Sequence, residues 1–256
     1  MNSTLSPPAV TVVALPARND FLLNHLLIPV VALLAISTLL MAGNGDQWLA
    51  DHIYQLEGGR WLLRDAWVTS HLIHHGGKSL SVLAAVLTLV TLLWASVDAR
   101  GQRCRRPLLY LLLTVALSTG LVSLLKSAIP MDCPWDLSRY GGFREFVGLF
   151  ETRPDGMPGA ACFPGGHASA GYAWVSLYFV ALVLRPAWRW PALALPLLVG
   201  AIFGIGQQLR GAHFLSHDVW ALGISWLLAT VLYLWMFRPG TKHAPPASIS
   251  TTGEMA

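Results

Sequence analysis

Six long runs of apolar residues constrain the fold of this chain more than any other feature of its sequence. Each run is about 20 residues long, which is the length that an α-helix needs to cross the hydrocarbon core of a bilayer. The runs lie at 22–42, 79–97, 107–125, 168–187, 191–209 and 219–237. We therefore predict an all-α integral membrane protein with six transmembrane helices in a bundle.

The composition argues against the alternative of six buried helices in a soluble protein. Such a protein needs a charged surface, whereas 12% of these 256 residues are charged and 54% are hydrophobic. The N-terminus carries Pro7, Pro8 and Pro16 and no basic residue ahead of a short apolar core, so we expect no cleaved signal. We expect a cytoplasmic segment at 1–21, a membrane domain at 22–237 and a disordered cytoplasmic tail at 238–256.

The distribution of arginine predicts the orientation of the spans. Short loops rich in Lys and Arg stay in the cytoplasm, and two such loops follow the second and fourth spans. Their arginines are Arg100, Arg103, Arg105, Arg106, Arg185 and Arg189. Both termini should then be cytoplasmic, and segments 43–78 and 126–167 should face outward. We expect a multi-pass protein of the bacterial cytoplasmic (inner) membrane, with its site facing the periplasm or exterior.

The basic balance of the chain does not indicate a nucleic-acid partner. The formal net charge of +4 and the pI near 9.2 are largely explained by the cytoplasmic arginines. No interleaving of aromatic and basic residues typical of an RNA or DNA reader is present. The sequence predicts the lipid bilayer as a partner and gives no indication of protein partners.

Three polar clusters lie at the outward ends of the spans, where ionisable groups are costly unless they face a polar cavity. The first begins at Lys126, at the end of the third span. The second is the turn Pro164-Gly165-Gly166-His167, before the fourth span. The third links the fifth and sixth spans and contains Gln207, Arg210, His213, His217 and Asp218.

Each cluster also has a purely structural explanation. Lys126 could snorkel to the membrane interface, and Pro-Gly-Gly could be only a turn and a helix cap. Asp218 could be a favourable charge in the first turn of the last helix, with Ser216 as its N-cap. The chemical reading is that the Gly165 and Gly166 amides form a phosphate site, beside a histidine that can exchange a proton near neutral pH.

Taken in order, the three clusters resemble the three-part signature of the phosphatidic acid phosphatase type 2 family, which shares its site with vanadium haloperoxidases. The resemblance implies that His213 attacks phosphorus, with Asp218 holding its other ring nitrogen. It implies that His167 protonates the leaving group. The remaining residues of the signature, which would bind the phosphate, are Lys126, Arg210, Gly165 and Gly166. The resemblance implies no metal and no cofactor.

The chain departs from the family pattern at four positions. Cys133 stands where the first motif has arginine, and Gly165 stands where the second has serine. In the third motif, Gln207 replaces arginine and His217 replaces aspartate, with Asp218 one step late. Possible substitutes for the missing arginines are Arg210, Arg139 and Arg144, and His217 is a second candidate for the nucleophile.

Two further groups of residues bear on the site. Cys133 and Cys162 both lie on the outward, oxidising side beside a phosphate motif, and either form a disulfide that joins the two motifs or are unrelated thiols. Cys104 lies on the cytoplasmic side. Three histidines at helical spacing could mimic a metal cluster, but we interpret them as part of an interfacial amphipathic helix. They are His71, His74 and His75.

These observations predict a metal-independent lipid phosphatase that acts through a phosphohistidine at the outer face. Phosphatidate, phosphatidylglycerol phosphate, a polyprenyl diphosphate and a lipid A phosphate all fit the chemistry. A phosphotransferase could use the same residues, and a non-catalytic lipid-phosphate-binding protein would also explain the altered motifs. A transporter is disfavoured because the ionisable residues gather at one membrane edge and not at the midplane.

Overall fold

The computed structural model describes residues 18–149, 151–157 and 159–237, apart from the side chains of Arg18, His74 and His75. Within these ranges the chain is helical and has no strand; Leu137 and Arg144 form one isolated parallel β-bridge. The tail predicted at 238–256 and all but the last four residues of the segment at 1–21 lie outside the described residues.

Six helices in the described part of the chain are long and apolar enough to cross a membrane, which confirms the six predicted spans. They extend over Asn19–Ala42, Val68–Val97, Ala99–Ala128, Gly166–Leu184, Pro186–Leu209 and Leu215–Phe237. The protein is therefore a multi-pass membrane protein.

Several spans are built from consecutive helical segments. The first comprises α1 (Arg18–Leu22), η1 (Leu23–Leu27), α2 (Ile28–Ser37) and η2 (Thr38–Ala42). The second comprises η3 (Val68–Gly76) and α4 (Gly77–Val97), and the third η4 (Ala99–Gly101) and α5 (Gln102–Ala128). The fourth comprises α6 (Gly166–Tyr172), η7 (Ala173–Ser176) and α7 (Leu177–Leu184). The fifth comprises η8 (Pro186–Trp188) and α8 (Arg189–Leu209), and the sixth is the single helix α9 (Leu215–Phe237).

The second and third spans are longer than the apolar runs that predicted them. The π-helical segment η3, which contains His71, continues directly into α4. At the other end of α4, η4 and the first turns of α5 carry the arginines predicted to be in a loop. Helices here extend past the apolar run because backbone hydrogen bonding continues into the polar ends, which a hydropathy pattern does not report.

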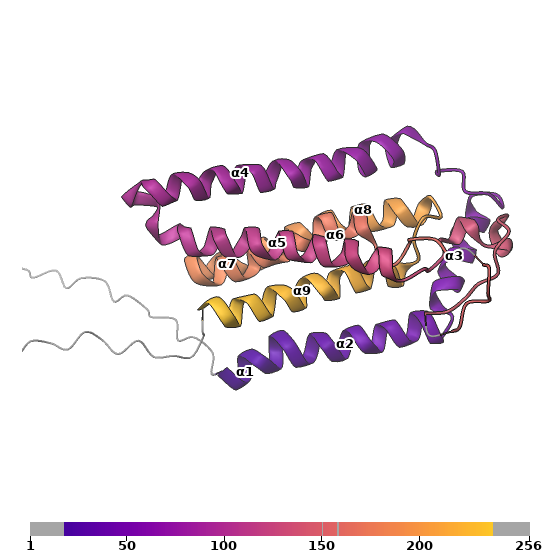
Figure 1. Cartoon of the computed structure of the whole chain (residues 1–256), viewed down its shortest axis with the longest axis horizontal. Coiled ribbons are helices and arrows are strands. Elements are labelled where there is room, and N and C mark those ends of the chain that lie inside the picture. Colours follow the sequence, from indigo (N-terminus) through magenta and orange to yellow (C-terminus); the bar gives the residue numbers. More distant parts are fainter. Residues whose placement is uncertain (1–17, 150, 158, 238–256) are drawn as a thin grey trace, which may run out of the picture.

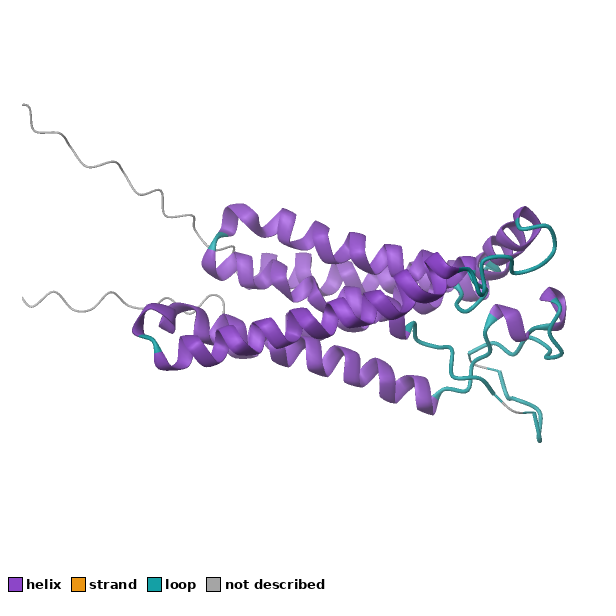
Figure 2. Cartoon of the chain, turned by 90° about the horizontal axis from the view of Figure 1, so that it is seen from above, coloured by secondary structure: helices purple, strands orange, loops and turns teal. Residues whose placement is uncertain are grey.

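The spans run side by side with alternating direction, so the two described ends of the chain lie at one end of the bundle (Figure 1). The segment η4, which contains Arg100, and the segment η8, which is flanked by Arg185 and Arg189, lie at that same end. The opposite end carries α3 (Gly45–Leu56) and most of the loop structure, including η5 (Pro134–Asp136) and η6 (Ser138–Tyr140) (Figure 2). We call this end the loop end of the bundle.

Small residues bring α6 close to α8. A Cβ on Gly171 would lie 2.5 Å from the backbone nitrogen of Gly200, and a Cβ on Gly200 would lie 2.2 Å from the ring of Tyr172. Only glycine permits this approach, as at other close helix crossings in membranes. The crossing fixes α6, and with it the second polar cluster, against the helix that leads to the third.

Aromatic packing holds the other half of the bundle together. Phe21, Tyr178, Phe179 and Tyr233 belong to one buried cluster that joins the first, fourth and sixth spans. Tyr110 of α5 is fully buried in the same cluster, and its hydroxyl donates to the carbonyl of Ala229, 2.8 Å away. By contrast α4 stands at the edge of the bundle, and most of its large side chains are exposed to the surrounding lipid. The aromatic cluster thus lies at the centre of the bundle, and α4 lies at its edge.

Candidate active site

The three polar clusters predicted from the sequence meet at the loop end. Lys126 lies in the last turn of α5, His167 is the second residue of α6, and His213 lies just before α9. The charges of Lys126, His167 and His217 all act on His213. Groups from three spans therefore form one cluster, although they are separated by more than forty residues along the chain.

The Gly165–Gly166 turn lies between the first and third clusters. A Cβ on Gly166 would lie 4.0 Å from the Nζ of Lys126, so the lysine reaches over the start of α6. On the other side, a Cβ on Gly165 would lie 2.5 Å from Oδ1 of Asp218. The Gly165 amide, which we expected to bind phosphate, donates instead to the carbonyl of His217 at 2.9 Å. Gly165 is thus a structural contact to the third cluster, and Gly166 faces the lysine.

Replacing Gly165 by alanine should destabilise the protein and lower its activity. The added methyl group would overlap the buried carboxylate of Asp218, and overpacking of this kind costs about 1–3 kcal/mol. Thermal unfolding in detergent measures the effect. Gly120→Ala in α5 is the matched control, because no atom lies within 4 Å of its added Cβ. Equal melting temperatures for the two variants would contradict the close packing described here.

His213 and His217 form a buried pair. Their Nδ1 atoms are 3.2 Å apart, and the side chains are 5% and 0% exposed. Burial lowers the pKa of His213 well below 6.5, and the nearby Lys126, His217 and His167 lower it further. The His213 ring is therefore neutral at physiological pH, which leaves one ring nitrogen with a lone pair.

Asp218 does not occupy the place expected for it. We predicted that its carboxylate holds the second ring nitrogen of His213, but His217 has that position. The Asp218 carboxylate accepts a hydrogen bond from Nε2 of Gln208 at 2.7 Å and lies against Gly204. The one-residue shift in sequence turns Asp218 to another face of α9, because successive helical residues point about 100° apart.

Arg210 is also directed elsewhere. Its Nε donates to the backbone oxygen of Arg64 at 2.7 Å, and its Nη1 lies 3.3 Å from Oε1 of Gln207. We expected Arg210 to lie on the same helical face as Gln207 and to bind phosphate. However, α8 ends at Leu209, so Arg210 is the residue after the helix and follows the turn toward segment 57–67. Gln207 remains buried, and its Nε2 has no hydrogen-bond partner within the described structure.

The two further arginine candidates are engaged in ion pairs. Arg139 forms a bidentate pair with Asp51 of α3 at 2.7 and 2.5 Å, and its side chain is 54% exposed. Arg144 pairs with the buried Asp132 at 2.6 Å. Each of these arginines is therefore paired with a carboxylate of α3 or of the segment that follows α5.

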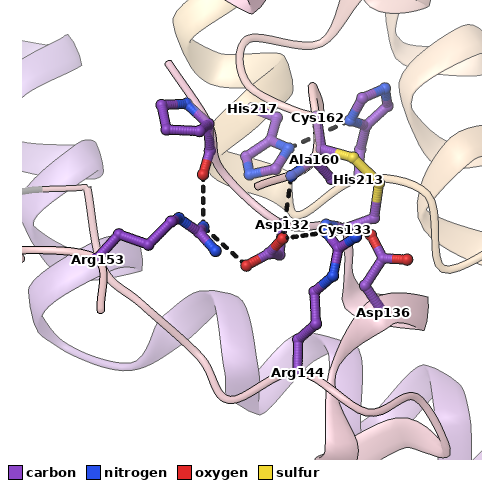
Figure 3. Close-up of a disulfide and its surroundings, with 10 residues drawn as sticks. Asp132, Cys133, Asp136, Arg144, Arg153, Ala160, Cys162, His213 and His217 are labelled. Atoms are coloured by element: carbon purple, nitrogen blue, oxygen red, sulfur yellow. Dashed lines mark hydrogen bonds and ion pairs between the residues drawn. A yellow bond between two sulfur atoms is a disulfide. The ribbon is translucent and has the colours of Figure 1, made fainter. Parts of the chain in front are cut away.

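A disulfide joins Cys133 and Cys162, which is the pairing that the sequence analysis put forward. Close to it, Asp132 accepts hydrogen bonds from Arg144, Arg153 and the amide of Ala160 (Figure 3). The Cys162 carbonyl lies within hydrogen-bonding reach of the rings of His213 and His217. The disulfide thus fixes the segment between the first two motifs beside the histidine pair.

Removing this disulfide should cost about 3–4 kcal/mol of stability, the value expected for closing a loop of this length; the two cysteines are 29 positions apart. The expected result is a lower melting temperature in detergent for Cys162→Ser, reproduced by adding a reductant to the unsubstituted protein. Cys104→Ser is the control, because Cys104 lies outside the disulfide. Mass mapping that finds both thiols reduced in protein taken directly from membranes would contradict the prediction.

Two positioning residues were missed by the sequence analysis. Asp46 of α3 is buried, and its Oδ1 accepts a hydrogen bond from the backbone amide of Ser216 at 2.9 Å. It therefore caps α9 from a distant part of the chain, in place of the local Ser216 cap that we expected. Gln208, which holds Asp218, was not singled out either. No local pattern predicts such partners, because the Asp46 contact spans 170 positions.

One group of possible metal ligands occurs among the described residues. It consists of Cys133, Asp136 and Cys162. Because the two sulfur atoms form the disulfide, they are not available as thiolate ligands. The group is better explained as part of the loop that the disulfide closes.

The family to which the chain belongs follows from comparison with known proteins. The family model described as the PAP2 superfamily matches residues 107–240, more than half of the chain. The chain belongs to the PAP2 superfamily. The match starts in α5 and covers all three polar clusters, so it confirms the resemblance to the phosphatidic acid phosphatase type 2 family. No curated protein and no solved structure matches the chain. Because PAP2 proteins are phosphatases, the chain is in general terms a phosphoric ester hydrolase.

Proposed function

We propose that this PAP2 protein is a metal-independent lipid phosphatase that acts at the outer face of the membrane through a phosphohistidine on His213. The observation that carries the proposal is the convergence of Lys126, His167 and His213 from three separate spans. Lys126 lies against Gly166, the residue before His167, and the charges of Lys126 and His167 act on His213. Such a cluster supplies a nucleophile, an acid and a positive charge within one site.

In the proposed reaction, Nε2 of His213 attacks phosphorus with its lone pair while the bond to the leaving oxygen breaks. His167 gives a proton to that oxygen. The positive charge of Lys126 stabilises the charge that develops on the phosphoryl oxygens. Water, activated by His167 acting as a base, then attacks phosphorus, which breaks the P–N bond and returns His213 to its neutral form.

A groove between α4, α5 and α6 supports a lipid as the substrate. It has a volume of about 470 Å³ and reaches Gly166 and His167. Apolar side chains such as Val82, Leu112 and Val115 line it on the membrane side. An acyl or prenyl chain in this groove would place its phosphorylated head at the start of α6, beside Lys126.

The positions of the arginines support an outward-facing site. The segments η4 and η8, with the neighbouring residues Arg103, Arg185 and Arg189, lie at the end of the bundle opposite to the polar cluster. Under the positive-inside rule this end is cytoplasmic. In a bacterial cytoplasmic membrane the site would then face the periplasm or exterior, where the disulfide is also stable.

The test is a phosphate-release assay with purified protein in detergent and excess chelator. The substrates are phosphatidate, phosphatidylglycerol phosphate, a polyprenyl diphosphate and a lipid A phosphate. Chelator-resistant release from at least one of them is expected. Transfer of the phosphoryl group to a second lipid without free phosphate would identify a phosphotransferase. Lipid binding with no turnover on the whole panel would contradict the enzymatic proposal.

A further inference from the structure

The histidine pair at the start of α9 has an arrangement that the expected mechanism does not use. His213 and His217 are four residues apart, and the contact between them joins the two Nδ1 atoms at 3.2 Å. Figure 3 shows the two rings beside the disulfide, joined by this contact. Both side chains are buried, so the contact lies away from bulk solvent.

A contact between two ring nitrogens requires one donor and one acceptor. If His217 is the donor, neutral His213 carries its own proton on Nε2, and this nitrogen has no lone pair for attack. If His213 is the donor, its Nδ1 carries the proton and its Nε2 is nucleophilic. Only the second arrangement is productive, and it makes Nδ1 of His217 the acceptor.

The sequence position of His217 matches this role. It is the fourth residue after His213, where the resemblance to the phosphatidic acid phosphatase type 2 family leads us to expect a carboxylate. The carboxylate that the chain does carry, on Asp218, is held by Gln208. The imidazole of His217 therefore lies beside Nδ1 of His213, where the carboxylate was expected.

We propose that His217 is the positioning residue of the nucleophile and holds His213 in the tautomer that leaves Nε2 free to attack. This inference rests on the proposed function. When the P–N bond forms, the His213 ring becomes cationic, and the proton on its Nδ1 is shared with Nδ1 of His217. No atom is lost or gained at His217 during the cycle.

The surroundings of His217 keep its ring in place. The ring packs edge-on against Phe163 and Phe214, with centroid distances of 5.4 and 5.6 Å. The His217 carbonyl accepts from the amide of Gly165, and Asp46 holds the preceding residue, Ser216. Because both the ring and its backbone are fixed, His217 can direct the orientation of a neighbouring side chain.

The test compares two replacements of similar size, His217→Asn and His217→Phe. Asparagine places an acceptor oxygen near the position of Nδ1, whereas phenylalanine keeps the packed ring and has no acceptor. The assay uses the panel lipid that the unsubstituted protein hydrolyses fastest. His217→Phe should lower kcat about a hundredfold or more with little change in KM, whereas His217→Asn should stay within about tenfold of the unsubstituted protein.

A second readout does not depend on turnover. Orthovanadate mimics the pentacoordinate phosphoryl group, so its binding to the protein, followed by ⁵¹V NMR, should weaken strongly in His217→Phe and only slightly in His217→Asn. Equal kcat values for the two variants, whether high or low, would overturn the inference. If the unsubstituted protein neither releases phosphate nor binds orthovanadate, the proposed function itself fails, which is a distinguishable result.

Discussion

Replacing His213 by alanine should lower phosphate release by at least about a thousandfold, as expected for loss of a covalent nucleophile. The His213 ring is buried and neutral, and it lies within the field of Lys126, His167 and His217. The measurement is phosphate release by purified protein in detergent, with thermal unfolding to show that the variant is folded.

His52→Ala is the control for the His213 replacement. His52 lies in α3 at the same end of the bundle, is exposed, and bonds only the backbone oxygen of Trp48 among the contacts described. It should keep the activity of the unsubstituted protein. A folded His213→Ala variant with activity within about tenfold of that level would show that the nucleophile has been wrongly assigned.

Replacing Lys126 by methionine should lower kcat by about 10²- to 10³-fold, which is the usual cost of one group that stabilises charge in a transition state. Methionine keeps the length of the side chain and removes its charge. The lysine lies over Gly166, and its charge interacts with that of Asp218. No other lysine or arginine in the described structure acts on His213 in the same way. The activity should therefore be sensitive to this one charge.

Arg185→Met is the control for charge removal. Arg185 is exposed and lies at the end of α7, opposite to the site. Its replacement also removes one positive charge but should leave kcat unchanged. If Lys126→Met changed only KM, Lys126 would bind the substrate in the ground state and would not stabilise the transition state. If it had no more effect than Arg185→Met, Lys126 would only snorkel at the membrane interface.

The fold could be predicted from the sequence because the membrane restricts the possible structures. Each run of about 20 apolar residues has to form a helix if its backbone is to be satisfied in lipid, and all six were found. The ends of the second and third spans could not be predicted, because polar residues such as His71 and Arg103 continue the helices beyond the apolar runs. The helix α3 was not predicted either, since its residues carry no long apolar run.

Part of the site was also predictable. The motifs placed Lys126, His167 and His213 on the same side of the membrane, and the structure brings them together. The partner of His213 was not predicted correctly, because a shift of one residue along a helix changes the face on which a side chain lies. The direction of Arg210 was not predictable, because it depends on where α8 ends and on contacts with segment 57–67.

Mapping the covalent intermediate tests the central claim most directly. The protein is mixed with its fastest panel substrate in the presence of chelator, quenched under alkaline conditions that preserve phosphohistidine, and digested for mass spectrometry. We expect the phosphoryl group on His213, and no phosphorylated His213 in the His167→Ala variant treated with a substrate whose leaving group needs a proton. A phosphoryl group on His217 or on another residue, or turnover without any protein-bound phosphate, would contradict the account.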